Sequence, residues 1–307
     1  MCIRDSTDRV GALVFSEYPE FAPPEDLLKL QDLGEVDRAI HHLQEDLPLS
    51  PEMRCLLLRS STLGGARPKA TFAFQGRRWL AKFPAIGDDL DVQALEAATL
   101  LTAERSGINV PRFKLEPGHY GQILLVERFD RQGTLTPARR LHFFSAAAAL
   151  NCDYATGQAA YTDLAAFIRQ FSMFPDRDLR EMYRRMVFNI LTDNTDDHVR
   201  NHGFLCAPGR GLWLSPAFDM VPQLTNLPYQ QLGLKPGSTT PTINLIYEVA
   251  SAFDLSASVS HQIVEYVRAG VATFEAALKT CGASSQLTDQ VLSSLILKTQ
   301  AIGLNCV

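Results

Sequence analysis

The chain has 307 residues, of which 46% are apolar and 21% are charged, and its net charge is −5 at pH 7. These values are typical of a globular protein and exclude a disordered or fibrous one. The acidic balance argues against nucleic-acid or membrane binding driven by bulk charge. The six cysteines form no CxxC pair and therefore indicate reduced thiols rather than a zinc site. No apolar run approaches the ~20 residues of a membrane span, so we expect a cytoplasmic protein.

The first residues, MCIRDS, lead almost directly into a predicted strand over residues 10–15. They have no evident structural role and indicate a start assigned within a longer gene, so we expect a truncated N-terminus. Between residues 17 and 54 the sequence predicts a Pro-rich bend and two weakly amphipathic helices, at about 25–33 and 35–46.

A β-rich segment follows. Residues 71–83 predict two short strands around a turn at Gln75 and Gly76, because apolar side chains alternate with period two in the second strand. A helix with one apolar face is predicted next, and it ends at Gly107. Residues 111–130 predict a second hairpin, which ends in a strongly apolar strand.

Helices dominate from residue 137 onward. The clearest lies over residues 178–191, where apolar side chains at i, i+3 and i+4 form an unbroken stripe. One short hairpin around a Pro-Gly turn interrupts the helices, and two more helices are predicted at about 257–280 and 286–301. A β-rich segment with one helix, followed by a helix-rich segment with one hairpin, predicts an α+β chain of two lobes.

The stretch NTDDHVRN, residues 194–201, places many polar residues between two apolar segments. Asp196 and Asn201 are separated by four residues, and Asp219 follows eighteen residues after Asn201. Phosphoryl transfer needs one carboxylate to orient the attacking hydroxyl, and an amide and a second carboxylate to hold Mg²⁺. The D-x-x-x-x-N spacing is that of kinase catalytic loops. Taken alone, the spacing is common by chance, and a polar turn after a helix is the alternative.

Two residues upstream strengthen the kinase interpretation. Lys82 lies on a predicted strand between apolar residues, where an ammonium group is costly to bury unless it meets an anion. Kinases supply two such anions, the nucleotide phosphates and a helix glutamate, and Glu96 follows on the predicted helix. The alternatives are a lysine that reaches water from an edge strand and a solvated glutamate. Each alternative would be favoured for an isolated residue.

The sequence SSTLGGARPKA, residues 60–70, is a candidate phosphate-binding loop. It is neither a Walker A motif nor G-x-G-x-x-G. Gly64 and Gly65 leave their backbone N–H groups open to an anion, and Arg67 and Lys69 add two cations. The loop is therefore suited to bind phosphate. A flexible surface turn is the alternative interpretation.

The motifs TLGGARPKA, LAKFP, ERSGINVP, VERFDR, NTDDHVRNHGFL and LSPAFDMVP, taken together, resemble those of the HipA family. These are bacterial serine/threonine kinases, the toxins of HipA–HipB toxin–antitoxin pairs. The motifs cover residues 60–223 in the order of the family, which is far more specific than any one of them. The resemblance implies a protein-kinase-like fold, with a β-rich N-lobe containing one helix and a mostly helical C-lobe. It also implies ATP and Mg²⁺ as cofactors.

By position, the resemblance implies a role for each motif. Asp196 would be the catalytic aspartate, with Asn201 and Asp219 as metal ligands. Lys82, set by Glu96, would bind the phosphates. The residues implied in nucleotide binding are Gly64, Gly65, Ala66, Arg67, Pro68, Lys69, Lys82, Glu127, Arg128, Phe129, His198, Asn201, Phe218 and Asp219.

Within that set, residues 64–69 match the glycine-rich loop of the family, and residues 127–129 match the segment that contacts adenine. The family loop usually carries a serine two residues before its glycine pair, and autophosphorylation of that serine switches the enzyme off. Thr62 holds this position here and follows Ser60 and Ser61. We therefore expect the autophosphorylation site to be one of these three residues.

The resemblance divides the chain into a remnant of an N-terminal subdomain (1–55), an N-lobe (56–130, with the hinge at 126–131) and a C-lobe (131–307). It implies phosphorylation of a serine or threonine in a translation component such as glutamyl-tRNA synthetase, and growth arrest leading to persistence. It further implies a HipB-like helix-turn-helix antitoxin as partner, operator DNA bound through that antitoxin, and no membrane.

Two other functions stay open at the level of sequence. A small-molecule kinase, such as one that phosphorylates aminoglycosides, would share the aspartate–asparagine–aspartate set but not GGARPK or VERFDR. An inactive nucleotide-binding co-repressor partner of the antitoxin would bind ATP without transferring phosphate. The presence of all the expected catalytic side chains counts against this second alternative.

Overall fold

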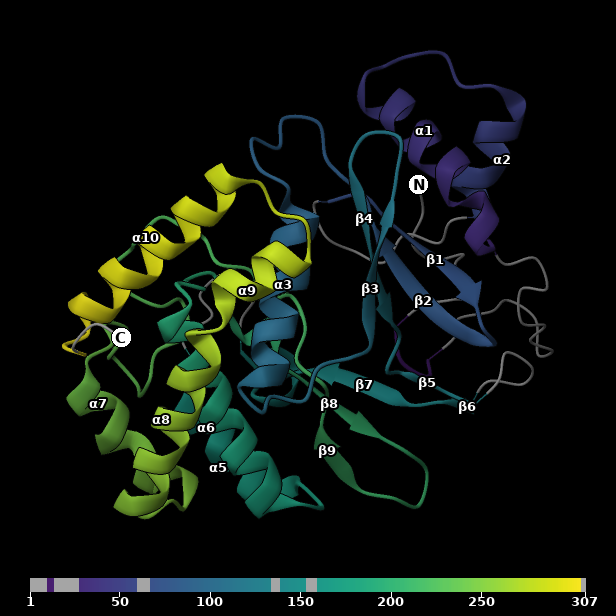
Figure 1. Ribbon diagram of the computed structural model, residues 1–307. Helices are drawn as coiled ribbons and strands as arrows, with labels where there is room; N and C mark the ends of the chain where they lie inside the picture. The colour runs from purple at the N-terminus through teal and green to yellow at the C-terminus, as the bar shows by residue number, and fades with distance from the viewer. Residues whose placement is uncertain (1–9, 14–27, 60–66, 134–138, 153–158, 305–307) are drawn as a thin grey trace. The chain divides into compact units, whose positions relative to one another are not determined.

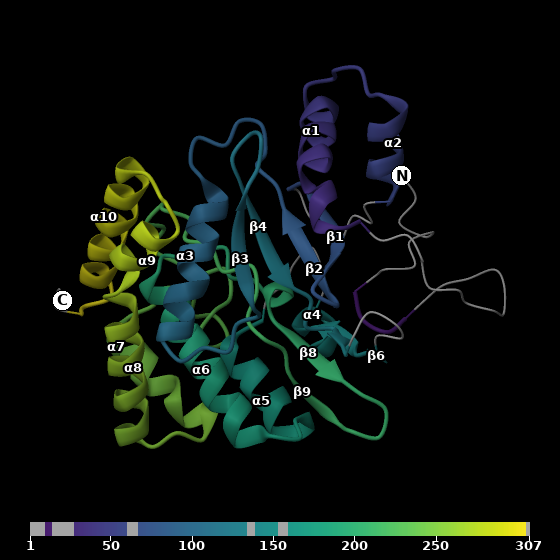
Figure 2. The ribbon, with the colours of Figure 1, turned by 45° about the vertical axis from the view of Figure 1, so that its right-hand side comes forward.

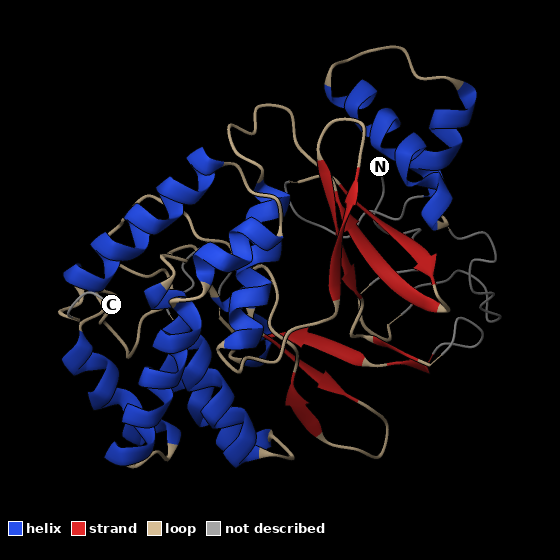
Figure 3. Cartoon of the chain, viewed as in Figure 1, coloured by secondary structure: helices blue, strands red, loops and turns tan. Residues whose placement is uncertain are grey.

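The computed structural model describes residues 10–13, 28–59, 67–133, 139–152 and 159–304. It has an α+β structure (Figure 3) in which the chain divides into two compact units. The first unit comprises Met1–Ala97 and Pro111–Phe143, and the second comprises Ala98–Val110 and Phe144–Val307.

The first unit is built around a four-stranded antiparallel sheet with the strand order β1-β2-β4-β3 (Figure 1). Its strands are β1 (Lys69–Phe74), β2 (Arg77–Lys82), β3 (Phe113–Pro117) and β4 (Gln122–Glu127). Both hairpins predicted from the sequence are present. Gln75 and Gly76 join β1 to β2 with φ values of 48° and 72°. Two left-handed residues form the tight turn whose twist matches that of paired strands.

Two helices, α1 (Leu33–Gln44) and α2 (Pro51–Arg59), lie side by side in the first unit (Figure 2). α1 is amphipathic, and its apolar face joins the same hydrophobic core as the sheet. That core contains Leu28, Leu33, Val36, Ile40, Ala70, Phe72, Trp79, Ala81, Phe83, Ile123 and Leu125. The predicted helix at 35–46 corresponds to α1, whereas α2 has no counterpart in the sequence prediction.

Two predictions near the N-terminus are wrong over the residues that the structure describes. Residues 28–33 are not the end of a helix, because Leu30–Asp32 is a 3-10 turn (η2) in which the Asp32 carboxylate accepts a hydrogen bond from Lys29 N at 2.7 Å. Residues 10–12 form a bend rather than a strand. Gly11 is left-handed there (φ 81°), and its N–H donates to the Asp130 carboxylate instead of a strand.

The remaining strands are short. β5 (Arg131–Gln132) pairs with β6 (Arg139–Arg140) in the first unit. β7 (His142–Ser145), β8 (Gly203–Cys206) and β9 (Leu212–Leu214) form a three-stranded sheet in that order. β8 and β9 are the hairpin that the sequence predicts in the helical segment.

The second unit is mostly helical, and α6 lies at its centre, packed against α5, α8 and α10. The predicted helix at 257–280 is in fact two helices, α8 and α9, because the chain turns at Ala272 and Thr273. No helix among the described residues is both long and apolar enough to cross a bilayer. The helices are α4 (Ala146–Ala149), α5 (Tyr161–Phe171), α6 (Pro175–Leu191), α7 (Ile243–Glu248), α8 (Ala257–Val271), α9 (Phe274–Thr280) and α10 (Ser285–Ala301), with 3-10 turns η3 (Val199–Asn201) and η4 (Val249–Phe253).

The two units do not divide where the family resemblance places the lobes. Residues 131–143 group with the sheet of the first unit, not with the helices. The helix α3 (Val92–Arg105) begins in the first unit and ends in the second, so residues 98–110 belong to the helical unit. Residues 28–59 belong to the same unit as the sheet, with which they share one core.

Candidate active site

The candidate active site begins where α6 ends. Thr192 closes the helix, with its Oγ1 donating to Phe188 O at 2.8 Å. At Asp193 the backbone becomes left-handed (φ 54°), which stops the helix and starts the loop over residues 194–201. The loop therefore leaves a rigid, buried helix, and its position is set from its first residue.

Asp196 is the exposed carboxylate of this loop, and its backbone is held on both sides. Gln231 N donates to Thr195 O at 3.1 Å, and Leu232 N donates to Asp197 O at 2.9 Å. Thr195 and Asp197 are buried, whereas Asp196 faces solvent. These bonds fix the backbone around Asp196 and leave its side chain in a position to meet an incoming molecule.

Asn201 and Asp219 lie near the same recess. Asn201 Nδ2 donates to Asp196 O at 3.2 Å, which turns the amide oxygen of Asn201 away from that carbonyl. Asp219 is exposed and adopts a left-handed backbone (φ 54°), which costs about 1 kcal/mol or more for a residue other than glycine. Such strain persists only where the surrounding structure determines it, so the direction of this carboxylate is specified.

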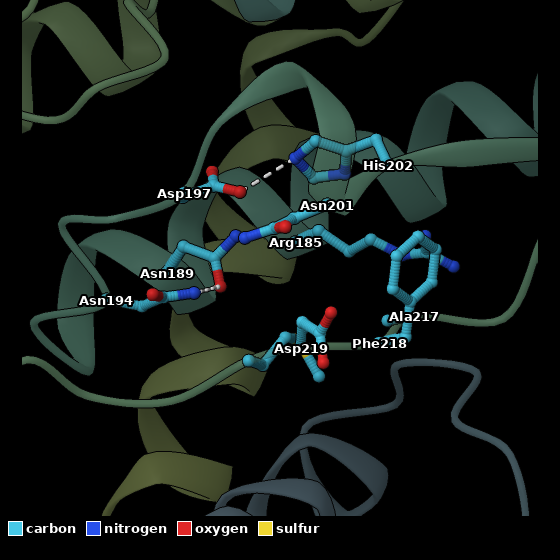
Figure 4. Close-up of a pocket in the computed structure, with 10 residues that line it drawn as sticks. Arg185, Asn189, Asn194, Asp197, Asn201, His202, Ala217, Phe218 and Asp219 are labelled. Carbon is cyan, nitrogen blue, oxygen red and sulfur yellow. Dashed lines mark hydrogen bonds and ion pairs between the residues drawn. The ribbon is translucent and has the colours of Figure 1, made fainter. Parts of the chain in front are cut away.

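Figure 4 shows this recess, which lies within the second unit. Its walls come from α6, the loop at 194–201 and the segment at 217–220. Asn201, Phe218 and Asp219 were all predicted as site residues, and the structure brings them together here. The lining residues are Arg185, Asn189, Asn194, Asp197, Asn201, His202, Ala217, Phe218, Asp219 and Met220.

A buried polar network underlies the loop, and the sequence did not reveal it. Asp197 accepts hydrogen bonds from the hydroxyl of Tyr161 and from His202 Nε2, the latter at 2.8 Å. Asn189 donates to the Tyr161 hydroxyl at 3.0 Å and accepts from Asn194 at 3.1 Å. Burial, and then the Asp197 charge, raise the pKa of Tyr161 well above its usual value, so the phenol stays protonated as a donor.

α6 also holds the segment that leads to the second carboxylate. Arg185, which is 1% exposed, donates to Ser215 O at 2.7 Å and pairs with Glu181 at 2.9 Å. Glu181 accepts from Asn109 N at 3.0 Å, and Asn109 O accepts from Ala217 N at 2.8 Å. Hydrogen bonds from α6, directly or through Asn109, therefore fix the backbone at Ser215 and Ala217, within four residues of the candidate metal ligand Asp219.

In the first unit, Lys82 and Glu96 form a largely buried ion pair. Lys82 Nζ lies 2.6 Å from Glu96 Oε1, and the two side chains are 13% and 7% exposed. Lys82 ends the central strand β2, where it pairs with Lys69 of β1 and Leu124 of β4. The lysine is therefore not on an edge strand, and the glutamate is not solvated.

The predicted adenine-contacting segment, residues 127–129, follows β4. The Glu127 carboxylate pairs with Arg77 at 2.5 Å, and the Phe129 ring packs against Phe143 at 6.1 Å between centroids. Arg128 is buried and turned away from solvent. All three side chains therefore contact other residues of the protein.

The buried partner of Arg128 is Asp130, which the sequence analysis did not single out. Arg128 and Arg131 both pair with this carboxylate, at 2.8 and 2.7 Å, and Gly11 N donates to it at 2.7 Å. Burial would by itself raise the pKa of Asp130, but the Arg128 hydrogen bond and the two arginine charges outweigh burial and lower it. Asp130 therefore carries a charge that anchors the segment after β4.

Much of the predicted phosphate-binding loop lies outside the described residues, including Ser60, Ser61, Thr62, Gly64, Gly65 and Ala66. Of its described part, Arg67 pairs with Asp88 at 2.6 Å, and Pro68 O accepts from Phe83 N at 3.0 Å. Lys69 is the first residue of β1. His198 is half-buried at the start of η3, and its carbonyl accepts from Asn201 N at 2.8 Å.

The donor set of the recess fits a hard cation that is shared with a ligand. The described residues contain no group of three or more His, Cys, Asp or Glu side chains arranged to hold a metal ion. Asn201 and Asp219 instead offer amide and carboxylate oxygens, which suit Mg²⁺ bound by one or two protein groups plus phosphates and water. They do not suit zinc, which prefers sulfur and nitrogen ligands.

Two curated relatives of the chain are named as putative kinases. Relatives named "Putative kinase" in Haemophilus influenzae and "Putative kinase Y4dM" in Sinorhizobium fredii are each 27% identical to it, over 139 and 168 residues. The matches cover 41% and 50% of this chain, and 40% and 39% of the relatives. The chain therefore spans about two fifths of the length of these relatives.

Two solved structures share the fold. A chain of the HipA, HipB and operator DNA complex from Shewanella oneidensis MR-1 is similar with a TM-score of 0.69 and 15% identity, covering 95% of this chain and 75% of that one. The Helicobacter pylori proinflammatory kinase CtkA is similar with a TM-score of 0.55 and 13% identity, covering 76% and 90%. The α+β fold is thus kinase-like.

A family model, the HipA-like C-terminal domain, matches residues 61–276, which is more than half of the chain. The chain therefore belongs to the HipA family.

Proposed function

We propose that the chain is an ATP- and Mg²⁺-dependent protein serine/threonine kinase of the HipA toxin type. The observation that carries this proposal is the loop at 194–201, in which the exposed Asp196 is fixed by backbone bonds and linked to Asn201. Asn201 and Asp219 line one recess and supply the oxygen donors that a phosphate-bound Mg²⁺ requires. The buried Lys82–Glu96 pair supports the same function from the first unit.

Each side chain has a role that follows from its surroundings. Asn201 and Asp219 would hold Mg²⁺, which supplies charge neutralisation for the phosphates. Lys82, oriented by Glu96, would bind the phosphates, and residues 62–69 would cover them. The hydrogen bond from Lys82 Nζ to Glu96 Oε1, at 2.6 Å, fixes the direction of the ammonium group.

Asp196 would orient the acceptor hydroxyl. In the transfer, the hydroxyl oxygen forms a bond to the γ-phosphorus, the bond from that phosphorus to the β–γ bridging oxygen breaks, and ADP leaves. The hydroxyl proton passes to the Asp196 carboxylate. Because that side chain is exposed, whereas its neighbours on both sides are buried, a protein-borne serine or threonine can reach it.

The finer assignments rest on family membership. Autophosphorylation at Thr62, Ser61 or Ser60 would use the same chemistry on the phosphate-binding loop. The HipA structure above was solved with HipB and operator DNA, which supports a HipB-type helix-turn-helix partner for this chain. A translation component such as glutamyl-tRNA synthetase is the proposed substrate, with growth arrest and persistence as the result.

Transfer of labelled γ-phosphate from ATP to protein tests the proposal. We expect Asp196→Asn and Asp219→Asn each to lower the rate by at least about 100-fold. Removal of Mg²⁺ with EDTA should abolish transfer. Asp289→Asn, the same change at an exposed site on α10, is the matched control and should label like the wild type. Equal labelling by all four proteins would refute the assignment.

The choice of acceptor separates the proposed protein kinase from the small-molecule kinase. Casein and the chain itself are the protein acceptors, and an aminoglycoside is the small hydroxyl compound. Labelling of protein supports the proposal, and labelling of the aminoglycoside alone contradicts it. ATP binding without any transfer would favour the inactive co-repressor.

A further inference from the structure

A buried cluster in the second unit joins the C-terminal helix to both loops of the candidate site. Its members are Asp193, Asn226, Ser294 and Lys298, here called the Asp193 cluster. Asp193 directly precedes the loop at 194–201, and Asn226 follows Asp219 by seven residues. Ser294 and Lys298 lie on α10, about one hundred residues later in the chain. The cluster therefore links three segments that are distant in sequence.

Both carboxylate oxygens of Asp193 are used in the cluster. Oδ2 accepts from Ser294 Oγ at 2.9 Å and from Asn226 N at 3.0 Å. Oδ1 lies 3.1 Å from Lys298 Nζ. Lys298 Nζ also donates to Leu227 O at 2.8 Å, so one ammonium group bridges the two loops.

The backbone of Asp193 adds a further bond between the same two loops. Its carbonyl accepts from Gln223 N at 3.0 Å and from Thr195 N at 2.9 Å. The segment after Asp219 is thus held to Asp193 at Gln223, at Asn226 and, through the ammonium group, at Leu227.

Burying the charged groups of the cluster costs free energy, so their presence needs a reason other than stability. Asp193 is 0% exposed and Lys298 is 3% exposed. Desolvation of such a pair can exceed its Coulombic attraction, so stability alone does not account for it. A well-established use of buried polar groups is to specify one geometry.

The backbone near the cluster contains several left-handed residues, which indicates that the cluster fixes the backbone conformation of the two loops. Asp193, Asp219, Leu224 and Asn226 all have φ values between 51° and 56°. They make up half of the left-handed non-glycine residues in the described part of the chain. Left-handed residues of this kind persist where surrounding contacts over-determine them, and they gather at functional sites. The Asp193 cluster supplies those contacts for Asp193 and Asn226.

We propose that Lys298 and Asp193 are positioning residues, through which α10 sets the loop of Asp196 and Asn201 against the segment of Asp219. They touch neither nucleotide nor acceptor, and they act by fixing the two loops relative to each other. The catalytic consequence rests on the proposed kinase function, whereas the mechanical link between α10 and the loops does not.

The first test measures the mechanical link by hydrogen–deuterium exchange of the full chain. Lys298→Met keeps the length of the side chain and removes its charge and donors. We expect faster exchange in two separate peptides, at residues 193–201 and 219–228. Lys279→Met, which removes an exposed lysine paired with Glu275 on α9, is the matched control and should change neither peptide. Faster exchange confined to α10 would overturn the proposal.

The second test measures kcat and KM for ATP, with casein as acceptor, at a temperature where circular dichroism shows each variant folded. We expect Lys298→Met to lower kcat by about 10- to 100-fold, because small misplacement of reacting groups has effects of this size. KM for ATP should change little. The double variant Asp193→Asn/Lys298→Met removes the unpaired buried charge and should regain stability but not kcat. A folded Lys298→Met with wild-type kcat would overturn the proposal.

Ser294→Ala covers the case in which Lys298→Met does not fold. It deletes one hydroxyl that bonds to Asp193 and Asn226, at 2.9 and 3.2 Å, with little change in volume. We expect faster exchange in the same two peptides and a smaller fall in kcat. If the wild type transfers no phosphate at all, the proposed function fails, and the exchange results alone still decide whether α10 holds the two loops.

Discussion

Three carboxylates, Asp193, Asp196 and Asp197, lie within the six residues that follow α6, and their surroundings give them different properties. Asp193 and Asp197 are buried, and each is compensated by charged or neutral donors. Asp196 lies between them and is exposed. A buried carboxylate that contacts protein groups cannot be reached by a substrate hydroxyl, so the exposed one is suited to reaction. Asp193 and Asp197 instead hold the loop that carries Asp196.

The first prediction concerns the Tyr161 hydroxyl, which donates a hydrogen bond to Asp197. Tyr161→Phe removes one donor to Asp197 and one acceptor for Asn189, both within a fully buried network. Because a bond to a charged group is lost, we expect the free energy of unfolding to fall by about 1.5–3 kcal/mol. Urea denaturation measures the change, and Tyr266→Phe, at a tyrosine that is 55% exposed, is the control. Equal losses in both variants would contradict a role for the network.

Asp130 predicts a specific dependence of stability on pH. Its pKa is lowered in the folded chain, so its contribution is complete above the unfolded value of about 3.9 and is lost as the pH falls through the folded value. At pH 7, Asp130→Asn should cost about 3–5 kcal/mol, because it removes the charge with which the buried Arg128 and Arg131 pair.

Denaturant unfolding of wild type and Asp130→Asn between pH 7 and pH 2 measures this dependence. The gap in unfolding free energy should be wide at neutral pH and should narrow below about pH 4. Asp89→Asn, at an exposed aspartate of the same unit, should show no such gap. A gap that is constant over the whole range would mean that the Asp130 charge does not stabilise the fold.

At the scale of elements, the close packing of α8 against Ser106 decides whether the substitution Gly270→Ala stabilises or destabilises the protein. Gly270→Ala would ordinarily stabilise a helix by about 1 kcal/mol, because alanine has the higher helix propensity. A Cβ at Gly270 would, however, lie 2.2 Å from Ser106 Oγ and 2.7 and 2.8 Å from the Ser106 backbone. We therefore expect Gly270→Ala to lower the midpoint of thermal unfolding, at a cost of about 1–3 kcal/mol.

Ser106→Ala separates side-chain crowding from backbone crowding at this contact. It removes the hydroxyl but leaves the Ser106 Cα and N in place, so Gly270→Ala should stay destabilising in the Ser106→Ala background. Recovery to the stability of Ser106→Ala alone would show that only the hydroxyl was in the way.

Local patterns predicted the elements that local chemistry determines. The turn at Gln75 and Gly76 and the stripe of α6 depend on neighbouring residues, and both are present as predicted. The bend at residues 10–12 was mistaken for a strand, because its hydrogen bond goes to Asp130, more than one hundred residues away. α2 was missed, because it has a weak apolar face and packs mainly against α1.

At the scale of the whole molecule, the spacing of motifs predicted candidate site residues but not the contacts that support them. The D-x-x-x-x-N spacing of Asp196 and Asn201 is that of kinase catalytic loops. Lys298 looked like any lysine near the end of a helix, because its partner Asp193 is 105 positions away. No pattern in a single sequence reports such a pairing, since helical periodicity describes one element at a time.

The last prediction tests separately the proposed nucleotide-binding residues of each unit. Lys82 belongs to the first unit and Asp219 to the second. A non-hydrolysable ATP analogue with Mg²⁺, at about 100 times its dissociation constant, should stabilise the wild type by about 2.7 kcal/mol. Lys82→Met and Asp219→Asn should each remove most of this gain, and without Mg²⁺ the wild type should gain less.

The quantity to compare is the ligand-induced shift in each variant, not its absolute stability, because Lys82→Met removes the buried ion pair with Glu96 and lowers the stability without ligand. Thermal unfolding followed by differential scanning fluorimetry gives both values. Lys279→Met should keep the full shift, since it changes an exposed ion pair of the second unit. A full Mg²⁺-dependent shift in Asp219→Asn would place the metal elsewhere, and a full shift in Lys82→Met would show that Lys82 does not bind the nucleotide.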